Sequence, residues 1–221
     1  MADIGDDENV VVIGLGRFGG AVAGTLQKLG HEVLGIDNDP KLVQEWSERL
    51  THVAEADATD EDALRQLGVP DFTHAVVGIG TRMEQSVLTV LALVEIGVSH
   101  IWAKAISAKH GKILSSVGAT KVIYPESAMG DRVAHLITSR MIDFIEFEDD
   151  FAIAKTRVPR AAVGKTLATL GLRSKHGITV VGVKQPGRDF AFASPDTVIP
   201  ENATLIVSGP AAKVQKFAAT T

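Results

Sequence analysis

The chain of 221 residues is long enough for one sizeable domain or two smaller ones. Its 22 Lys and Arg residues are outnumbered by 27 Asp and Glu residues, and the net charge of −5 argues against binding to nucleic-acid phosphates. The absence of cysteine excludes disulfides, thiolate metal sites and cysteine nucleophiles, and it suits a reducing cytosol.

Neither a targeting segment nor a membrane span is expected. Residues 1–10 are acidic and have neither the basic region nor the long apolar core of a signal peptide. The most apolar stretch, residues 87–94, is less than half the length that spans a bilayer. We therefore expect a soluble protein, which would serve a membrane process only by docking to another chain.

Apolar strand patterns alternate with amphipathic helical patterns from residue 10 to about residue 141, which is typical of a doubly wound parallel sheet. The expected strands are residues 10–13, 32–36, 52–56, 75–79, 101–105 and 121–124. The expected helices are residues 19–29, 83–96 and 109–117, one that begins at Pro40 and one that begins at Thr59. Pro40 fits the first turn of a helix, where a missing N–H costs nothing, and Thr59 with Asp62 forms a capping-box pattern.

The acidic residues 142–150 break this alternation, so we expect a domain boundary there. Residues 1–141 then form a Rossmann-like α/β lobe that includes a crossover helix, and residues 142–221 form a small α+β lobe. In the second lobe we expect strands at residues 151–158, 179–183 and 204–208, a turn at residues 184–189, and helices at residues 167–170 and 211–217.

A glycine-rich loop follows the first strand. Gly14, Gly16 and Gly19 have the G-x-G-x-x-G spacing, in which the first glycine permits a tight turn, the second lets phosphates approach the backbone and the third lets the helix pack on the strand. The helix start offers free N–H groups and a partial positive charge to phosphates. Asp37 ends the second strand, where a carboxylate accepts hydrogen bonds from ribose hydroxyls and repels a 2′-phosphate. These features predict a site for an adenine nucleotide other than NADP.

Further residues follow the other strands at the same edge of the sheet, where ligands bind in such folds. They are Asp57, Ala58 and Thr59; Gly78, Ile79 and Gly80; Lys104; and Tyr124, Pro125 and Glu126. Simpler interpretations stay open for three of them: Thr59 as a helix cap, Gly80 as a plain turn and Lys104 as a solvated strand end.

Six segments, VIGLGRFGG, GHEVLGID, ADATDEDAL, GIG, IWAKA and VIYPESAMG, carry a resemblance to a known family. Together they resemble the RCK (regulator of potassium conductance) domains of Trk/Ktr-type bacterial potassium-uptake systems. The resemblance implies a cytosolic regulatory subunit that binds ATP, ADP or NAD(H) without turnover and gates a membrane-embedded potassium transporter subunit. It also implies a cytoplasmic, peripheral location at the inner face of the cell membrane, and a homo-oligomer in which dimers assemble into an octameric ring.

The resemblance also assigns residues in the first lobe. It places the nucleotide phosphates on the glycine loop, the ribose at the end of the second strand, the adenine beside the third strand, and the rest of the pocket at the ends of the fourth and fifth strands. In this order the residues are Gly14, Gly16, Arg17, Phe18 and Gly19; Asp37 and Asn38; Asp57, Ala58 and Thr59; and Ile79, Gly80 and Lys104.

Glu126 corresponds in the family to an acid that helps bind a cation, Mg²⁺ or Ca²⁺, beside the phosphates. Its alternative role is a helix N-terminal charge favoured by the macrodipole. The chain departs from the family pattern at residues 81–84, which read Thr-Arg-Met-Glu where relatives often carry Asn or Gln. This departure bears on the phosphate contacts and on the ATP/ADP preference.

The second lobe resembles the C-terminal RCK lobe, because residues 164–173 match its GxxLxxLxLR stretch. In the family this lobe dimerises, and in some members it binds cyclic di-AMP. Arg173, Lys175 and His176 carry charge that suits such a ligand; alternatively they form a solvated basic turn.

Two other functions are less consistent with the sequence. An NAD-dependent oxidoreductase needs an acid/base or a metal beside the nicotinamide. Tyr124, however, has Ala128 rather than Lys four residues later, and the seven histidines do not pair at metal-ligand spacing. A DNA-binding regulator needs a helix-turn-helix and a basic face, and neither is visible. We therefore expect no catalytic residues and no nucleic-acid partner.

Overall fold

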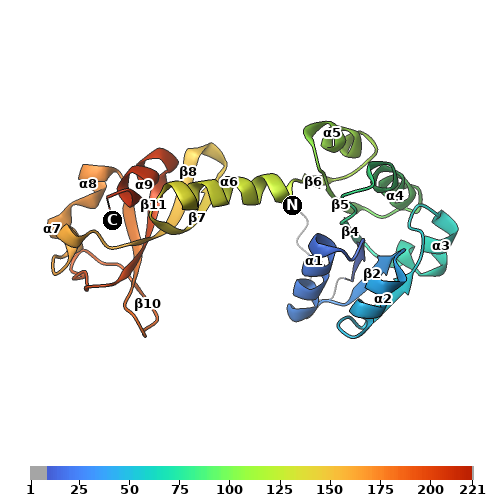
Figure 1. The fold of residues 1–221 in the computed structure, drawn as a ribbon, viewed down its shortest axis with the longest axis horizontal. Coiled ribbons are helices and arrows are strands. Elements are labelled where there is room, and N and C mark those ends of the chain that lie inside the picture. Colours follow the sequence, from blue (N-terminus) through green and yellow to red (C-terminus); the bar gives the residue numbers. More distant parts are fainter. Residues whose placement is uncertain (1–8, 221) are drawn as a thin grey trace. The chain divides into compact units, whose positions relative to one another are not determined.

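A computed structural model describes residues 9–220 of the chain. Residue contacts divide the chain after Glu126 into two compact units, here called unit 1 and unit 2 (Figure 1). The division predicted after residue 141 leaves helix α6 (Pro125–Thr138) in the first lobe, whereas the contacts group most of it with unit 2. Within residues 9–220, no helix combines the length and the apolar character that a membrane span requires.

Unit 1 is built on the predicted six-stranded parallel sheet. Its strands are β1 (Val10–Ile13), β2 (Val33–Asp37), β3 (His52–Glu55), β4 (His74–Val77), β5 (His100–Lys104) and β6 (Lys121–Ile123). They lie in the order β3-β2-β1-β4-β5-β6, and each neighbouring pair is parallel. In this doubly wound order the chain proceeds outward from β1 in one direction and from β4 in the other.

Helices pack on both faces of this sheet. They are α1 (Arg17–Lys28), α2 (Pro40–Ser47), α3 (Glu61–Gln66), α4 (Met83–Glu95) and α5 (Ala108–Ser116), with a 3-10 turn η1 (Val69–Asp71) before β4. On β1, Val10 and Val12 pack with side chains of α1 and α2, whereas Val11 and Ile13 pack with side chains of α3, α4 and α5. None of these four β1 side chains is more than 1% exposed, so the sheet lies between two apolar cores.

The start of α3 differs from the prediction. The expected capping box of Thr59 and Asp62 is wrong, because Asp60 caps the helix with a side chain that accepts hydrogen bonds from the backbone N–H groups of Asp62 (2.9 Å) and Ala63 (3.4 Å). Thr59 instead donates both its N–H and its hydroxyl to Asp57 Oδ1. Thr59 and Asp60 are both residue types that cap helices, and Asp60 occupies the N-cap position.

Unit 2 contains a five-stranded antiparallel sheet in the order β10-β9-β11-β8-β7 (Figure 1). The strands are β7 (Met141–Phe147), β8 (Phe151–Arg157), β9 (Thr179–Lys184), β10 (Phe190–Phe192) and β11 (Thr204–Pro210). β8, β9, β11 and the turn after β9 agree with the prediction. The acidic segment expected to mark only a boundary forms most of β7. Met141 and Phe144 enter the core, and the pairing of β7 with β8 shifts register between Met141 and Asp143.

The helices of unit 2 are α7 (Leu167–Leu170), α8 (Leu172–His176) and α9 (Ala211–Ala218). α7 and α9 were predicted, and α8 was not. α9 lies against β8 and β11 and buries Val214 and Phe217 in the core of the unit. Unit 2 is therefore an α+β fold with its own hydrophobic core, as expected.

Gly19 should be irreplaceable in unit 1. A β-carbon at Gly19 would lie 1.9 Å from the carbonyl oxygen of Gly14, whereas one at Gly16 would meet nothing within 4 Å. We expect Gly19→Ala to lower the free energy of unfolding by about 1–3 kcal/mol, as overpacking does, and Gly16→Ala to change it by less than about 1 kcal/mol. Thermal unfolding of both variants measures this, and equal loss in the two would contradict the packing argument.

Candidate functional site

The carboxyl ends of β1 and β4 lie side by side, and the chain leaves them in opposite directions along the sheet. In open α/β sheets this switch point forms the crevice in which ligands bind. α1 follows β1 and α4 follows β4, so two helix N-termini begin there. α1 starts at Arg17, two residues before the predicted start, which makes Gly16 its N-cap.

The helix caps distinguish these two helices from their neighbours. α2, α3 and α5 are capped by the side chains of Asp39, Asp60 and Ser107, respectively. α1 and α4 have Gly16 and Arg82 at the N-cap and no side-chain cap. Their first backbone N–H groups are therefore left to water or to a ligand, and the helix dipole favours a negatively charged one.

The glycine loop between β1 and α1 is held against the end of β4. Gly14 has φ +88°, and a β-carbon there would stand 3.1 Å from Ile79 atoms. Gly78 opens the GIG segment, but it was not among the predicted site residues. A β-carbon at Gly78 would lie 2.9 Å from the carbonyl oxygen of Gly14 and 3.1 Å from the Cα of Gly19. Its closeness to β1 in space, rather than its place in a motif, explains why glycine is needed.

Asp37, the residue predicted to bind the ribose, is also hydrogen-bonded to the glycine loop. Its Oδ2 accepts a hydrogen bond from the backbone N–H of Leu15 at 2.6 Å, and its Oδ1 accepts one from the N–H of Asp39 at 2.9 Å. The residue is half-exposed, and each carboxylate oxygen keeps a second lone pair. Asn38 beside it is exposed. The carboxylate is thus oriented by the loop and still able to accept from hydroxyl groups.

The predicted adenine position, residues 57–59, forms a local turn after β3. Asp57 Oδ1 accepts from the backbone N–H of Thr59 at 3.0 Å and from its hydroxyl at 2.8 Å. These hydrogen bonds lower the pKa of the Asp57 carboxyl. Ala58 is buried, and it packs in the core on the α3–α5 face of the sheet. The turn lies at the end of β3, next to the end of β2.

The remaining predicted residues meet around the ammonium group of Lys104, which ends β5. Lys104 Nζ donates to Glu126 Oε1 at 2.5 Å, and it lies 5.8 Å from the centroid of the Phe18 ring. The same side chain passes within 3.0–3.6 Å of where a β-carbon of Gly80 would stand. The hydrogen bond from Lys104 lowers the pKa of Glu126, and the charge of Arg17 acts in the same direction. Residues from the glycine loop, β4, β5 and α6 therefore converge here.

The sequence analysis gave Glu126 a metal-binding role that stays a prediction. Its carboxylate oxygens are ligands of the kind that Mg²⁺ and Ca²⁺ take. Residues 9–220 contain no cluster of three or more His, Cys, Asp or Glu side chains that could hold a metal ion. Glu126 therefore fits such an ion only if phosphate oxygens and water complete the coordination, and its carboxylate is paired with Lys104.

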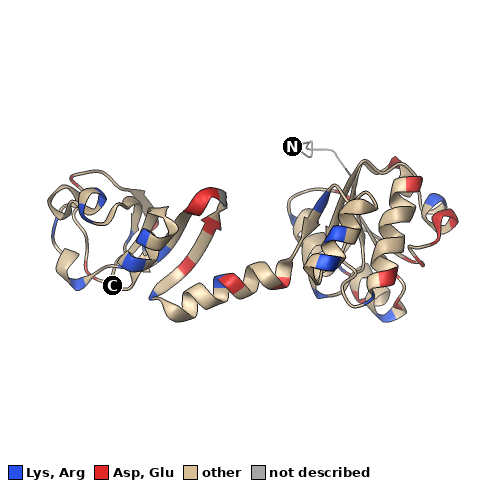
Figure 2. Cartoon of the chain, turned by 90° about the horizontal axis from the view of Figure 1, so that it is seen from above, with Lys and Arg blue, Asp and Glu red and all other residues tan. Residues whose placement is uncertain are grey.

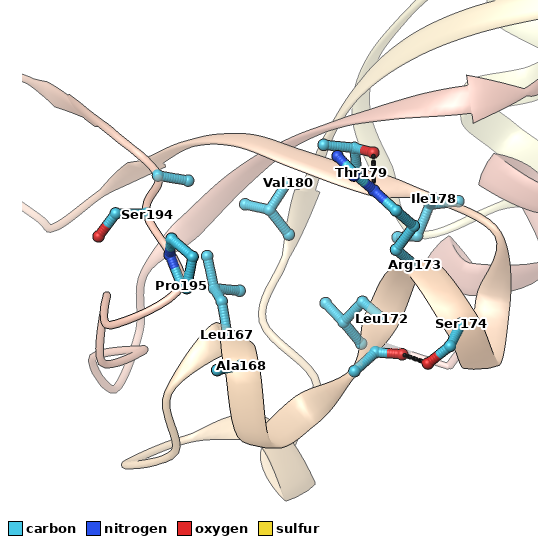
Figure 3. Close-up of a pocket in the computed structure, with 12 residues that line it drawn as sticks. Leu167, Ala168, Leu172, Arg173, Ser174, Ile178, Thr179, Val180, Ser194 and Pro195 are labelled. Atoms are coloured by element: carbon cyan, nitrogen blue, oxygen red, sulfur yellow. Dashed lines mark hydrogen bonds between the residues drawn. The ribbon is translucent and has the colours of Figure 1, made fainter.

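Unit 2 contains a separate pocket of about 510 Å³ (Figure 3). Its walls come from α7, α8, the start of β9 and residues 193–195, and they are mainly apolar. Arg173 lines it and donates from Nε to Thr179 Oγ1 at 3.3 Å. The other two charged candidates, Lys175 and His176, are not among its lining residues, and the His176 ring instead meets Phe217 edge-on.

Comparison with known proteins identifies both units. The TrkA-N domain model matches residues 10–125, and the TrkA-C domain model matches residues 156–220. Ktr system potassium uptake protein A of Bacillus subtilis is 32% identical over 212 residues, which are 96% of each chain. Ktr system potassium uptake protein C of the same organism is 35% identical over 207 residues, which are 93% of this chain and 94% of that one.

Solved structures of GsuK have the same fold. Its RCK domain superimposes with a TM-score of 0.67 at 17% identity, over all of this chain and 49% of the other. The GsuK channel bound to NAD superimposes with a TM-score of 0.53 at 25% identity, over 99% of this chain and 39% of the other. The chain thus spans less than half to about half of these longer chains. With both domain models and near full-length relatives in agreement, the chain belongs to the TrkA-N/TrkA-C family of RCK-domain proteins.

Proposed function

We propose that the chain is the cytosolic, nucleotide-sensing regulatory subunit of a potassium-uptake system. The observation that carries this proposal is the match to two Ktr potassium uptake proteins over more than nine-tenths of each chain. The switch-point crevice supports the sensing part, because two uncapped helix N-termini and a carboxylate anchored to the glycine loop meet there.

The proposed ligand is ATP or ADP, with NAD(H) as the alternative. Phosphates would lie on Gly14, Gly16, Arg17 and Gly19, where open space at Gly16 admits them. The adenosine ribose would bind Asp37, a residue that also disfavours a 2′-phosphate. One GsuK structure is bound to NAD, and a second, which at 15% identity supports the fold alone, is bound to ADP. The shared adenosine part explains how one site takes all three ligands.

Regulation would arise from differential binding. A ligand shifts a conformational equilibrium only by the difference between its affinities for the two conformations. Backbone N–H groups at the loop contact phosphates that ATP, ADP and NAD have in common. Side chains at the phosphate end, Arg17, Lys104 and Glu126, are then the groups able to make the affinities differ. Binding without turnover suffices for such a role.

The proposed partner is a membrane-embedded potassium transporter subunit, reached from the cytoplasmic side of the membrane. The relatives named as parts of a potassium-uptake system support it. A homo-oligomer of dimers, assembled as an octameric ring, is part of the same proposal. Large apolar side chains exposed on α6 and β7 support association, because such groups mark interaction surfaces. They are Met129, Val133, Ile137, Ile145 and Phe147.

The pocket of unit 2 supports the proposal of a second ligand, cyclic di-AMP. Apolar walls suit purine rings, and Arg173 supplies a cation that suits a phosphodiester. A nucleic-acid partner receives no support, since acidic residues outnumber basic ones and Figure 2 shows residues of both signs scattered over unit 1.

Potassium flux tests the proposed function directly. Liposomes that hold a Ktr membrane subunit should take up potassium faster with this chain and ATP than with this chain and ADP. Empty liposomes and liposomes without the chain are the controls. A flux that responds to neither the chain nor the nucleotide would reject the regulatory role.

Asp37→Ala should weaken ATP, ADP and NAD alike, because all three present the adenosine ribose. The loss of charge-assisted hydrogen bonds predicts a fall in affinity of about 10- to 100-fold. Titration calorimetry measures it, and Glu45→Ala, which removes an exposed carboxylate paired with Arg49 on α2, is the control. Unchanged binding by Asp37→Ala would exclude the ribose assignment.

No redox turnover is expected when NADH or NAD is supplied. Hydride transfer needs an acid/base beside the nicotinamide, and Tyr124 has Ala128 rather than Lys four residues later. The absorbance of NADH should therefore stay constant with a panel of small carbonyl and hydroxyl compounds. A steady change that disappears in a single-residue variant of the site would favour the oxidoreductase alternative.

A further inference from the structure

Lys104 contacts both the start of α6 and the residues that follow β1 and β4. Its side chain is only 12% exposed, and its ammonium group is hydrogen-bonded to Glu126 Oε1 at 2.5 Å. The same group lies over the Phe18 ring of the glycine loop and against Gly80 after β4. A largely covered lysine side chain is therefore positioned at the loop that is proposed to bind phosphates, and the carboxylate that it holds belongs to α6.

The charges around this group are unequal. Glu126 is 67% exposed and carries its negative charge at neutral pH, because the hydrogen bond from Lys104 lowers its pKa. Arg17 adds a second positive charge close enough to act on the same carboxyl. One carboxylate thus faces two cations. Lys104, Arg17 and Glu126 together leave one positive charge, which attracts a phosphate.

Two anions would compete for Lys104 once a nucleotide binds. A terminal phosphate carries more charge than a carboxylate and attracts an ammonium group strongly. A carboxylate oxygen that holds an ammonium group is also not free to coordinate a divalent cation with full strength. Pairing of Lys104 with Glu126 and coordination of a cation by Glu126 therefore oppose each other.

We propose that Lys104 exchanges partners: it pairs with Glu126 in the nucleotide-free chain and with the terminal phosphate of a bound nucleotide, which releases Glu126 for a divalent cation. The inference rests on the proposed nucleotide site and adds a regulatory step to it. Glu126 is the second residue of α6, the helix by which the chain continues into unit 2. The exchange thus changes the charge state at the first turn of that helix.

A double-mutant cycle tests the exchange. ATP affinity is measured by calorimetry in EDTA for the wild-type chain, Glu126→Gln, Lys104→Gln and the double variant. If Glu126 competes for Lys104, Glu126→Gln should raise ATP affinity by a factor of about 3–30 in the wild-type background. The same substitution in the Lys104→Gln background should change it by less than about twofold.

An equal gain in both backgrounds would overturn the exchange, because Glu126 would then act only as a negative charge near the phosphates. Glu45→Gln, which neutralises an exposed carboxylate paired with Arg49, should leave ATP affinity unchanged in either background. Thermal unfolding of each variant excludes loss of folding as the cause. A wild-type chain that binds no ATP would reject the nucleotide site itself, which is a different result from a cycle without coupling.

A second measurement compares ATP affinity with and without Ca²⁺. Release of Glu126 from the lysine predicts that Ca²⁺ raises the ATP affinity of the wild-type chain and that Glu126→Gln abolishes this gain. An equal effect of Ca²⁺ on both proteins would show that Glu126 does not receive the cation, and would reject the proposal.

Discussion

The carbonyl oxygen of Gly14 is the point on which the architecture of unit 1 depends. The backbones of Gly19 and Gly78 both approach it so closely that a β-carbon at either residue would collide with it. This contact presses the first turn of α1 against the ends of β1 and β4. It therefore sets where the N–H groups of α1 point, and it explains why glycine occupies three places around one oxygen. The crevice at the switch point is a product of this backbone packing.

The electrostatic character of the crevice follows from what its helices lack. α1 and α4 begin without a carboxylate or hydroxyl cap, whereas α2, α3 and α5 each have one. A capping carboxylate at α1 or α4 would repel the phosphates for which the site is proposed. Asp37, an acid that is fixed to the loop, approaches it from β2 and accepts hydrogen bonds from the backbone N–H groups of Leu15 and Asp39. In the proposed nucleotide site, Asp37 would thus put negative charge at the ribose, while Arg17 and Lys104 would outweigh the charge of Glu126 at the phosphates.

Most of the fold of unit 1 could be predicted because its strands, helices and glycine loop are marked by residues close together in the sequence. The spacing of Gly14, Gly16 and Gly19 and the apolar runs of the strands are readable without a structure, and all six expected strands are present in one parallel sheet. Features that depend on distant residues could not be predicted in this way. Gly78 is required by β1, and the pairing of Lys104 with Glu126 joins residues 22 positions apart. β7 could not be predicted because its core residues, Met141 and Phe144, are three positions apart, and a register shift between Met141 and Asp143 breaks the two-residue period of a strand. The assignment of individual residues to phosphate, ribose or adenine rests on family resemblance and stays a prediction.

The uncapped N-termini of α1 and α4 limit how well such a sensor can distinguish one nucleotide from another. Backbone N–H groups recognise phosphate oxygens but not the identity of the molecule that carries them, so they give affinity to every competing nucleotide in common. Any ligand that binds only the folded protein raises its free energy of unfolding, by about 2.7 kcal/mol when the free ligand is at 100 times its Kd. Under saturation by a mixture, the bound fractions depend on the concentration of each nucleotide divided by its own Kd. A crevice of this kind therefore responds to a concentration ratio, and a change in the total pool that keeps the ratio constant leaves its state unaltered.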